Sequence, residues 1–444
     1  MMGLWLAVGL AAGPLVNAVM ILSLLLMRSK IRYEELFFGF WFMLILADSR
    51  QWSLHFAVNA KAIYIVFLAL FLVTDREGFR PFNKLYQRFV PFIALACISL
   101  LNIEGPLFTA IQRTLSYLLL LMIVPNFVAR FYREDRDEFF RKLLYFVCLA
   151  FIVGIALRYI NPTIVTLEDR YSGVFGNPNG MGIFCALCVF LFQAIEFISP
   201  GVYSRRERIL LYGLLGLSLV LCGSRGAMVG IGIFFLFRYL YRFSSFLGFL
   251  IFLIIAVGYQ LIEANAASIV LFLGLEDFFR VDTLATGSGR IIGWKFAWQN
   301  IQEAYVFGRG LGFSAYLYTE NFRELSMLGH LGNAHNSYLT FWLDTGLVGL
   351  ISYMAAFLSL LFQAARKFRL AMPMLYALLF MLNVESWLVA SLNPFTIILY
   401  TTITIMLLAA TDEEFLARME GLIKPEEDSE TDGEAPENTE LSAA

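Results

Sequence analysis

Long apolar runs recur along almost the whole chain and constrain its fold more than any other feature of the sequence. A helix of about 20 apolar residues crosses a hydrocarbon layer of about 30 Å. Because lipid offers no hydrogen-bonding partner to the backbone, each such run is expected to be a helix. Apolar residues make up 59% of the 444 positions and charged residues only 15%, which leaves too little polar surface for a soluble protein.

The runs predict an all-α integral membrane protein, a polytopic bundle of about 12–13 transmembrane helices. Three of them, 36–47, 60–73 and 88–101, are short for a full crossing. No basic segment precedes the first run, so we expect a retained helix there and not a cleaved signal. The expected helical segments are 4–27, 36–47, 60–73, 88–101, 107–128, 143–160, 181–198, 209–222, 227–241, 246–262, 338–365, 371–389 and 395–410.

Basic residues occupy every second loop between these segments, and the positive-inside rule makes those loops cytoplasmic. The remaining connections then face outward: 102–106, 161–179, 223–225 and the long stretch 263–337. The orientation of the amino terminus stays open, because Arg28, Lys30 and Arg32 would place it outside. The basic loop residues are Arg76, Arg80, Lys84, Arg88, Arg130, Arg133, Arg136, Arg141, Lys142, Arg205, Arg206, Arg208, Arg238, Arg242, Arg366, Lys367 and Arg369.

Four regions follow from this topology. Residues 1–262 form the N-terminal transmembrane helices, 263–337 a large periplasmic loop, and 338–410 the C-terminal transmembrane helices. Residues 411–444 contain twelve acidic residues against two basic ones and are expected to be a disordered cytoplasmic tail. The five cysteines fall in or beside apolar runs without a nearby His, so we expect core packing and no metal site.

Charged residues are sparse on the predicted outer face, so their positions are informative. Arg225 lies at the junction of two apolar segments, where a guanidinium could bind phosphate or could simply anchor the membrane interface. Arg290 lies in the long loop. His335 and Asn336 stand where the next apolar segment begins. His335 could take a proton from a hydroxyl, although a single loop His is also often only solvated.

Arginines inside the membrane are costly and usually have a partner or a function. Arg113 and Arg158 stand within or near the outer ends of their segments, and Glu385 is a candidate ion-pair partner. The sequence leaves open whether they form a structural pair or a ligand site. The glycines of 308–312 lack the Lys-Ser/Thr of a nucleotide-binding loop and predict a turn, and the Asn-Pro-Asn-Gly run at 177–180 predicts a turn and a helix start.

Taken together, these motifs resemble the O-antigen ligase/polymerase superfamily, which includes bacterial O-linked oligosaccharyltransferases. The resemblance spans roughly residues 165–350 and rests on the order of five short motifs on one predicted face. They are Arg170 with Gly-Asn-Pro-Asn (176–179), Ser-Arg-Gly-Ala (224–227), Ser-Gly-Arg to Trp294 (288–294), Gly-Arg-Gly-Leu-Gly-Phe (308–313), and His335-Asn336-Ser-Tyr-Leu with Gly346 and Gly349.

The resemblance implies a GT-C-like fold and glycosyl transfer, inverting and independent of metal, on the periplasmic face of the bacterial inner membrane. The donor would be a glycan on an undecaprenyl diphosphate, and the acceptor a sugar hydroxyl on lipid A–core or on another lipid-linked chain. By the same resemblance, Arg225 and Arg290 would bind the pyrophosphate and His335 would be the base. Arg170, Asn179, Trp294, Asn336 and Arg113 are expected to contact substrate. No cofactor and no nucleic acid are implied.

The physical requirements agree with these roles. A departing diphosphate carries negative charge that two guanidinium groups can stabilise, and a neutral hydroxyl needs a positioned base. A ligase and a polymerase differ only in the acceptor, so that choice stays open, with the ligase-like reading preferred. A transporter or flippase for lipid-linked glycans is the alternative of a different class. Such proteins place charges at the membrane midplane and show internal repeats, neither of which is seen here.

Overall fold

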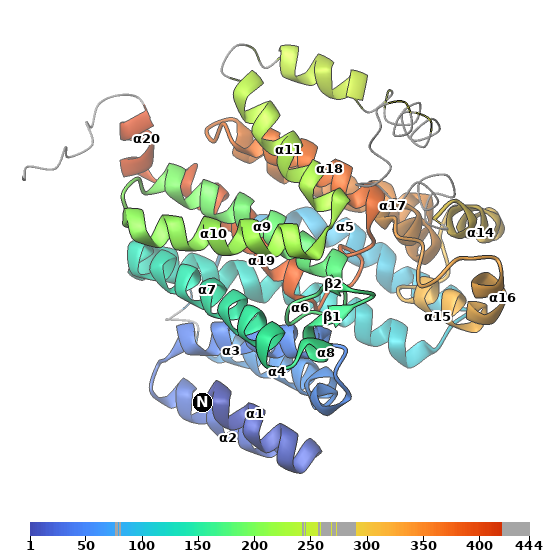
Figure 1. The fold of residues 1–444 in the computed structure, drawn as a ribbon, viewed down its shortest axis with the longest axis horizontal. Coiled ribbons are helices and arrows are strands. Elements are labelled where there is room, and N and C mark those ends of the chain that lie inside the picture. The colour runs from blue at the N-terminus through green and yellow to red at the C-terminus, as the bar shows by residue number, and fades with distance from the viewer. Residues whose placement is uncertain are drawn as a thin grey trace, which may run out of the picture.

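The computed structural model describes residues 1–75, 79, 81–241, 244, 246–255 and 290–419, with the single residues 258, 268 and 272. Helices dominate these residues (Figure 1), and the strands among them are the short antiparallel pair β1 (Thr166–Leu167) and β2 (Arg170–Tyr171). The chain is therefore an all-α polytopic membrane protein, as its apolar runs predicted. Residues 263–267, 269–271, 273–289 and the predicted tail beyond Met419 lie outside the described residues.

Every predicted apolar segment coincides with a helix as far as the structure describes it, except that the helix predicted at 371–389 ends at Val384. The helices before the β1–β2 pair are α1 (Met2–Ala12), η1 (Gly13–Leu15), α2 (Val16–Ser29), α3 (Tyr33–Asp48), η2 (Trp52–Leu54), α4 (Phe56–Thr74), α5 (Lys84–Ser99), η3 (Leu100–Asn102), α6 (Leu107–Glu134), α7 (Arg136–Ile160) and α8 (Pro162–Val165). The remainder contains α9 (Pro178–Ile198), α10 (Arg205–Cys222), α11 (Arg225–Leu240), α14 (Arg290–Glu303), α15 (Phe313–Glu320), α16 (Phe322–Met327), α17 (Ser337–Ala365), α18 (Ala371–Val384), α19 (Pro394–Ala409) and α20 (Glu413–Met419).

Seven helices among the described residues are long and apolar enough to cross a membrane, and three shorter apolar helices accompany them. Two segments that looked short in the sequence are parts of longer helices, Trp52–Thr74 and Lys84–Asn102. The expected number of about twelve or thirteen spans therefore includes helices such as α3 and α11, each 16 residues long, that fall short of a full crossing by length.

The core of the bundle is formed by α9 and α19. All residues of α19 are buried, and 83% of the apolar stretch of α9 is buried. A helix that is apolar on all sides is stable only when other helices surround it. Here α6, α9 and α17 pack around α19. The two central helices begin at neighbouring points, since Gly180 lies against the ring of Phe395.

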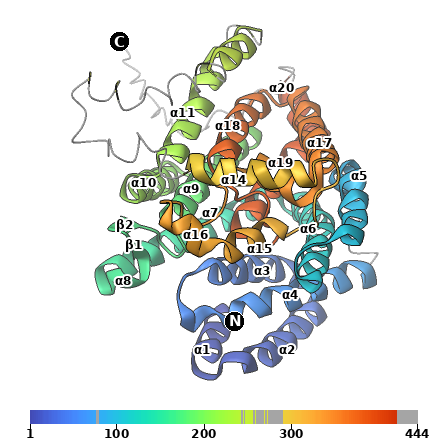
Figure 2. The same cartoon turned by 90° about the vertical axis from the view of Figure 1, so that its right-hand side faces the viewer.

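The segment before α17 folds into three helices at one end of the bundle. Figure 1 shows α14, α15 and α16 at the end opposite to α20, and Figure 2 shows them in front of the bundle when viewed from that end. The predicted turn at 308–312 is confirmed, with positive φ at Gly308, Gly310 and Gly312. It docks on a kink in α17 at Gly346, whose φ is 69° and where a Cβ would lie 2.2 Å from the carbonyl oxygen of Val306.

Candidate active site

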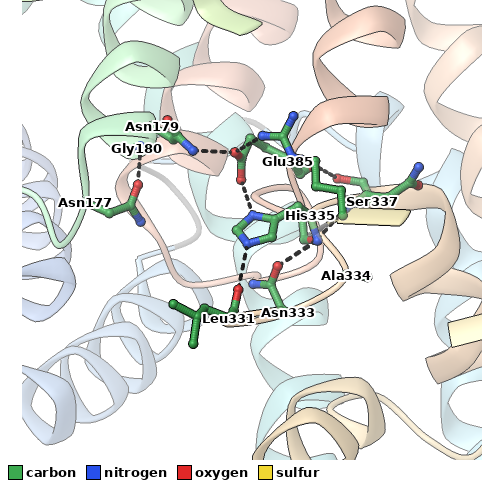
Figure 3. Close-up of polar contacts among 12 residues, drawn as sticks. Asn177, Asn179, Gly180, Leu331, Asn333, Ala334, His335, Ser337 and Glu385 are labelled. Carbon is green, nitrogen blue, oxygen red and sulfur yellow. Dashed lines mark hydrogen bonds and ion pairs between the residues drawn. The ribbon is translucent and has the colours of Figure 1, made fainter. Parts of the chain in front are cut away.

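The carboxylate of Glu385 joins three segments that are far apart in the sequence (Figure 3). Its Oε1 accepts hydrogen bonds from Asn179 Nδ2 at 2.7 Å and from Arg290 Nη2 at 3.1 Å. Its Oε2 lies 3.0 Å from His335 Nδ1. We call these four residues the Glu385 cluster. Glu385 is the C-cap residue of α18. It is contacted by the start of α9, the start of α14 and the loop before α17.

Local capping chemistry positions Asn179. The predicted turn and helix start at 177–180 is confirmed: Asn177 caps α9 by accepting a hydrogen bond from Gly180 N at 2.7 Å, and Pro178 occupies the first turn. Asn179 Oδ1 accepts from Arg170 Nη2 at 3.0 Å. Arg170 also donates to the carbonyl oxygen of Cys222 at 2.9 Å, which ties the cluster to the end of α10.

Arg225 begins α11 directly after the tight turn at Gly223, which was predicted and has the left-handed backbone of a helix C-cap. Its side chain is exposed. Small residues bring α11 onto α18, since Gly226 faces Val384 and Gly230 faces Met381 at distances that leave no room for a Cβ. Gly226 contacts Val384 across the interface between α11 and α18. Arg225 directly precedes Gly226 in the chain, and Glu385 directly follows Val384.

The backbone around His335 is held from several sides. His335 has a φ of 45°, in the left-handed region that is uncommon outside glycine. Trp294 Nε1 donates to the carbonyl oxygen of Ala334 at 2.8 Å, and His335 N donates to Asn333 Oδ1 at 2.8 Å. Trp294 thereby fixes the loop that carries the imidazole.

Asn336 lies at the start of α17, and its polar atoms are used within the protein. Its Oδ1 accepts from Leu339 N at 3.1 Å as the N-cap, and its Nδ2 donates to Asn383 Oδ1 at 3.0 Å. Its backbone N–H donates to Ser386 Oγ at 2.9 Å. These bonds join the beginning of α17 to the residues on both sides of Glu385 at the end of α18. Asn336 is buried and thereby fixes the position of Glu385 relative to His335.

The electrostatics of the cluster favour a charged pair. Burial lowers the pKa of His335, but the hydrogen bond and negative charge of Glu385 outweigh burial and raise that pKa above its ordinary value. Burial raises the pKa of Glu385, yet His335, Arg290 and Asn179 together hold it below its ordinary value. Because the carboxylate only accepts hydrogen bonds, the proton on His335 Nδ1 points at Glu385.

The cations of the cluster reach further towards solvent than the anion. The side chains of His335 and Arg290 are each 28% exposed, whereas that of Glu385 is 15% exposed. The second imidazole nitrogen, Nε2, lies 3.4 Å from the carbonyl oxygen of Leu331, which is too long for a strong hydrogen bond. The site therefore has two partly exposed side chains, Arg290 and His335, in front of a better shielded carboxylate, and His335 Nε2 faces the backbone of Leu331 and Gly332.

Of the predicted site residues, Arg290, His335 and Asn179 belong to this cluster, and among the described residues Arg113 bonds neither to it nor to the segments that hold it. Its guanidinium lies against Gly312, in the turn at 308–312, and makes no hydrogen bond or ion pair within the described residues. The suggested pairing of Glu385 with Arg113 or Arg158 is not found. Arg158 instead lies over the ring of Tyr171, 5.6 Å from its centroid. Glu385 pairs with Arg290 and His335, because the end of α18 lies beside the starts of α14 and α17.

Sequence reasoning missed two further parts of the site. Asn383 and Ser386, which flank Glu385 by one or two positions, receive bonds from Asn336. A polar Asn-x-Glu-Ser run directly after an apolar helix was the available signal. His330 is the second part: its ring packs against Gly293 of α14, where a Cβ would lie 2.4 Å from the ring. Gly293 therefore allows the loop before His335 to approach α14.

Fold and site together define a class: a polytopic helical membrane protein with a cluster of one arginine, one histidine and one carboxylate at one end of its bundle. Residues 210–354 match the family model of the O-antigen ligase domain. This match supports the resemblance to the O-antigen ligase/polymerase superfamily that the order of the motifs predicted. The matched residues include Arg225, Arg290 and His335 and end before Glu385. No curated protein matches the chain.

Proposed function

We propose that this protein transfers a glycan from undecaprenyl diphosphate to a sugar hydroxyl, with inversion at the anomeric carbon and without a metal ion. The observation that carries the proposal is the sharing of one carboxylate by Arg290 and His335, at 3.1 and 3.0 Å. Arg290 suits an anionic leaving group, and His335 suits a hydroxyl nucleophile. The domain match supports glycosyl transfer of the ligase and polymerase type in general.

The leaving group in this reaction is a polyprenyl diphosphate, which gains negative charge as the glycosidic C–O bond breaks. Arg225 and Arg290 are the groups we assign to it, because a guanidinium offers a planar fork of donors that matches phosphate oxygens. Among the described residues Arg290 makes one ion-pair contact, with Glu385, which leaves its other N–H donors for a ligand. Donors fixed in place before the charge develops stabilise the transition state without reorganisation.

The nucleophile is a neutral hydroxyl, and His335 is the residue we assign to its activation. Glu385 holds the Nδ1 proton, which leaves Nε2 as the nitrogen that can accept a proton when the imidazole is neutral. The acceptor O–H proton moves to Nε2 as the oxygen bonds to the anomeric carbon. The bond between that carbon and the diphosphate oxygen breaks at the same time, and its electron pair leaves with the diphosphate.

We assign the reaction to the periplasmic face of the inner membrane. This follows from the positive-inside topology, which puts α14–α16 and the Glu385 cluster on the outer side. A donor tethered by a lipid would reach a site at the end of the helix bundle. We prefer lipid A–core as the acceptor, and polymerisation onto a second lipid-linked glycan is the alternative within the same chemistry. Transport of the glycan would not need the His335–Glu385 pair, so we favour transfer over transport.

The test is a transfer assay with the purified full chain in nanodiscs. A labelled undecaprenyl-diphosphate glycan would be offered with lipid A–core, with unlabelled lipid-linked glycan, or with neither. A labelled lipid A–core product supports the ligase reading, and a chain-length ladder on the lipid carrier supports a polymerase. If neither acceptor is glycosylated while the glycan crosses the bilayer of proteoliposomes, the transferase proposal is wrong and transport replaces it.

A further inference from the structure

A second polar site lies at the other end of the helices that carry the Glu385 cluster. A cavity of about 250 Å³ lies between the last turns of α9 and α11 and the start of α10. The cavity is at the end of the bundle where α20 docks, since Arg418 of α20 donates to the carbonyl oxygen of Phe197 at 3.4 Å. The positive-inside rule predicts that this end is cytoplasmic. Side chains that line the cavity include Gln193, Glu196, Phe197, Tyr203, Arg208 and Arg238.

The lining carries one net positive charge, from two arginines and one carboxylate. The guanidinium of Arg208 makes no hydrogen bond or close ion pair within the described part of the chain, although its charge acts on Glu196 across the cavity. Arg238 donates to Gln193 Oε1 and has further donors unused among the described residues. Glu196 Oε2 is already bound by Gln193 Nε2 and by the Tyr212 hydroxyl, each at 3.3 Å. The cavity therefore offers guanidinium donors to a ligand. Glu196 Oε1 is buried and has no hydrogen-bond partner among the described residues, so it can accept a hydrogen bond from a donor on the same ligand.

The surroundings of the cavity suit a lipid. Each of the two arginines is followed in the sequence by a large, exposed apolar residue. Ile209 follows Arg208 and is 64% exposed, and Tyr239 follows Arg238 and is 56% exposed. Exposed apolar residues on transmembrane helices face acyl chains, and basic pockets between helices on the cytoplasmic side hold lipid headgroups. Phe197 adds an apolar wall within the cavity itself.

We propose that this cavity binds the phosphodiester headgroup of a phospholipid, with the phosphate between Arg208 and Arg238. A phosphodiester carries one negative charge and so neutralises the lining, while the acyl chains lie along the exposed faces of α10 and α11. The bound lipid joins α9, α10 and α11, the helices whose opposite ends hold Asn179 and Arg225. This site does not depend on the proposed transfer reaction, so either proposal can fail without the other.

Binding is measured on the delipidated full chain in detergent by native mass spectrometry. The probes are dioctanoyl phosphatidylglycerol, dioctanoylglycerol and inorganic phosphate. The variants are Arg208→Ala and Arg208→Lys, with Arg206→Ala as the matched control, because Arg206 is an exposed arginine on the same turn that does not line the cavity. Since Arg208 is itself exposed, its loss should leave the fold intact.

We expect phosphatidylglycerol to bind the wild-type chain and the Arg206→Ala control equally. Arg208→Ala should weaken that binding about tenfold or more, the scale of a lost hydrogen bond to a charged group, and Arg208→Lys should restore part of it. Equal binding by dioctanoylglycerol would show that the phosphate contributes nothing and would overturn the proposal. Equal binding by inorganic phosphate would overturn the assignment to a lipid. Unchanged binding in Arg208→Ala would overturn the assignment to this cavity.

Discussion

The imidazole of His335 and the carboxylate of Glu385 are 3.0 Å apart, although 50 residues separate them in the chain. The two side chains come from loops that flank α17 and α18, and the bonds from Asn336 to Asn383 and Ser386 join those loops beside the pair. A carboxylate behind an imidazole fixes the tautomer and stabilises the imidazolium that forms when the ring takes a proton. This relationship makes the pH dependence of the reaction a direct probe of the site.

Glu385→Gln should shift the pH profile of transfer towards lower pH. In the wild-type protein Glu385 raises the pKa of His335, so the neutral, basic imidazole appears only as the pH rises through that raised pKa. The amide removes the negative charge, which lowers the pKa and moves the rising limb of kcat/KM to lower pH. The plateau rate should also fall, because the amide can no longer hold the tautomer firmly. A profile with an unmoved limb would mean that His335 does not titrate in the reaction.

Arg225→Ala should raise the donor KM and lower kcat together, because the guanidinium is assigned to the diphosphate in both the bound state and the transition state. Arg225→Lys should recover only part of the loss, since an ammonium keeps the charge without the planar fork. Arg323→Ala is the matched control: Arg323 is an exposed arginine on α16 that makes no hydrogen bond or ion pair with the Glu385 cluster. Steady-state kinetics of all three variants at several donor concentrations provide the measurement. Equal effects of Arg225→Ala and Arg323→Ala would refute a specific role.

Turnover should survive EDTA. In the proposed reaction arginines stabilise the leaving group, and no group of three or more metal-ligating side chains occurs among the described residues. The assay compares transfer rates in chelator with rates after addition of Mg²⁺ or Mn²⁺. Loss of activity that either cation restores would show that the leaving group needs a metal.

Trp294→Phe should lower kcat while leaving the donor KM nearly unchanged. The substitution keeps an aromatic ring but removes the hydrogen bond to the carbonyl oxygen of Ala334, which holds the loop before His335. A bond of this kind contributes about 1 kcal/mol, so kcat should fall several-fold. The structural readout is faster hydrogen exchange in the segment around Ala334. If kcat falls with no change in exchange, Trp294 acts on substrate and not on the loop.

The helices and their order could be predicted from the sequence because membrane crossing imposes long apolar runs and basic loops. Turns could also be predicted where glycine or a cap residue dictates the backbone, as at Gly223 and Asn177. The meeting of Arg290 and His335 on Glu385 could not be derived from spacing, since it depends on how α18 packs on α11 and α17. Asn336 shows the same limit, because a polar residue beside His335 suggests a ligand contact, whereas its side chain is used to cap α17 and to bind Asn383.

The most direct test of the central claim is single-turnover transfer by His335→Ala, measured together with donor binding in nanodiscs. If His335 is the base, donor affinity should stay close to wild type while the rate of transfer falls about 100-fold or more, the usual contribution of a general base. His335→Gln gives a second variant that keeps a polar side chain in the loop, and it should be equally slow. Transfer by His335→Ala at the wild-type rate would contradict the account.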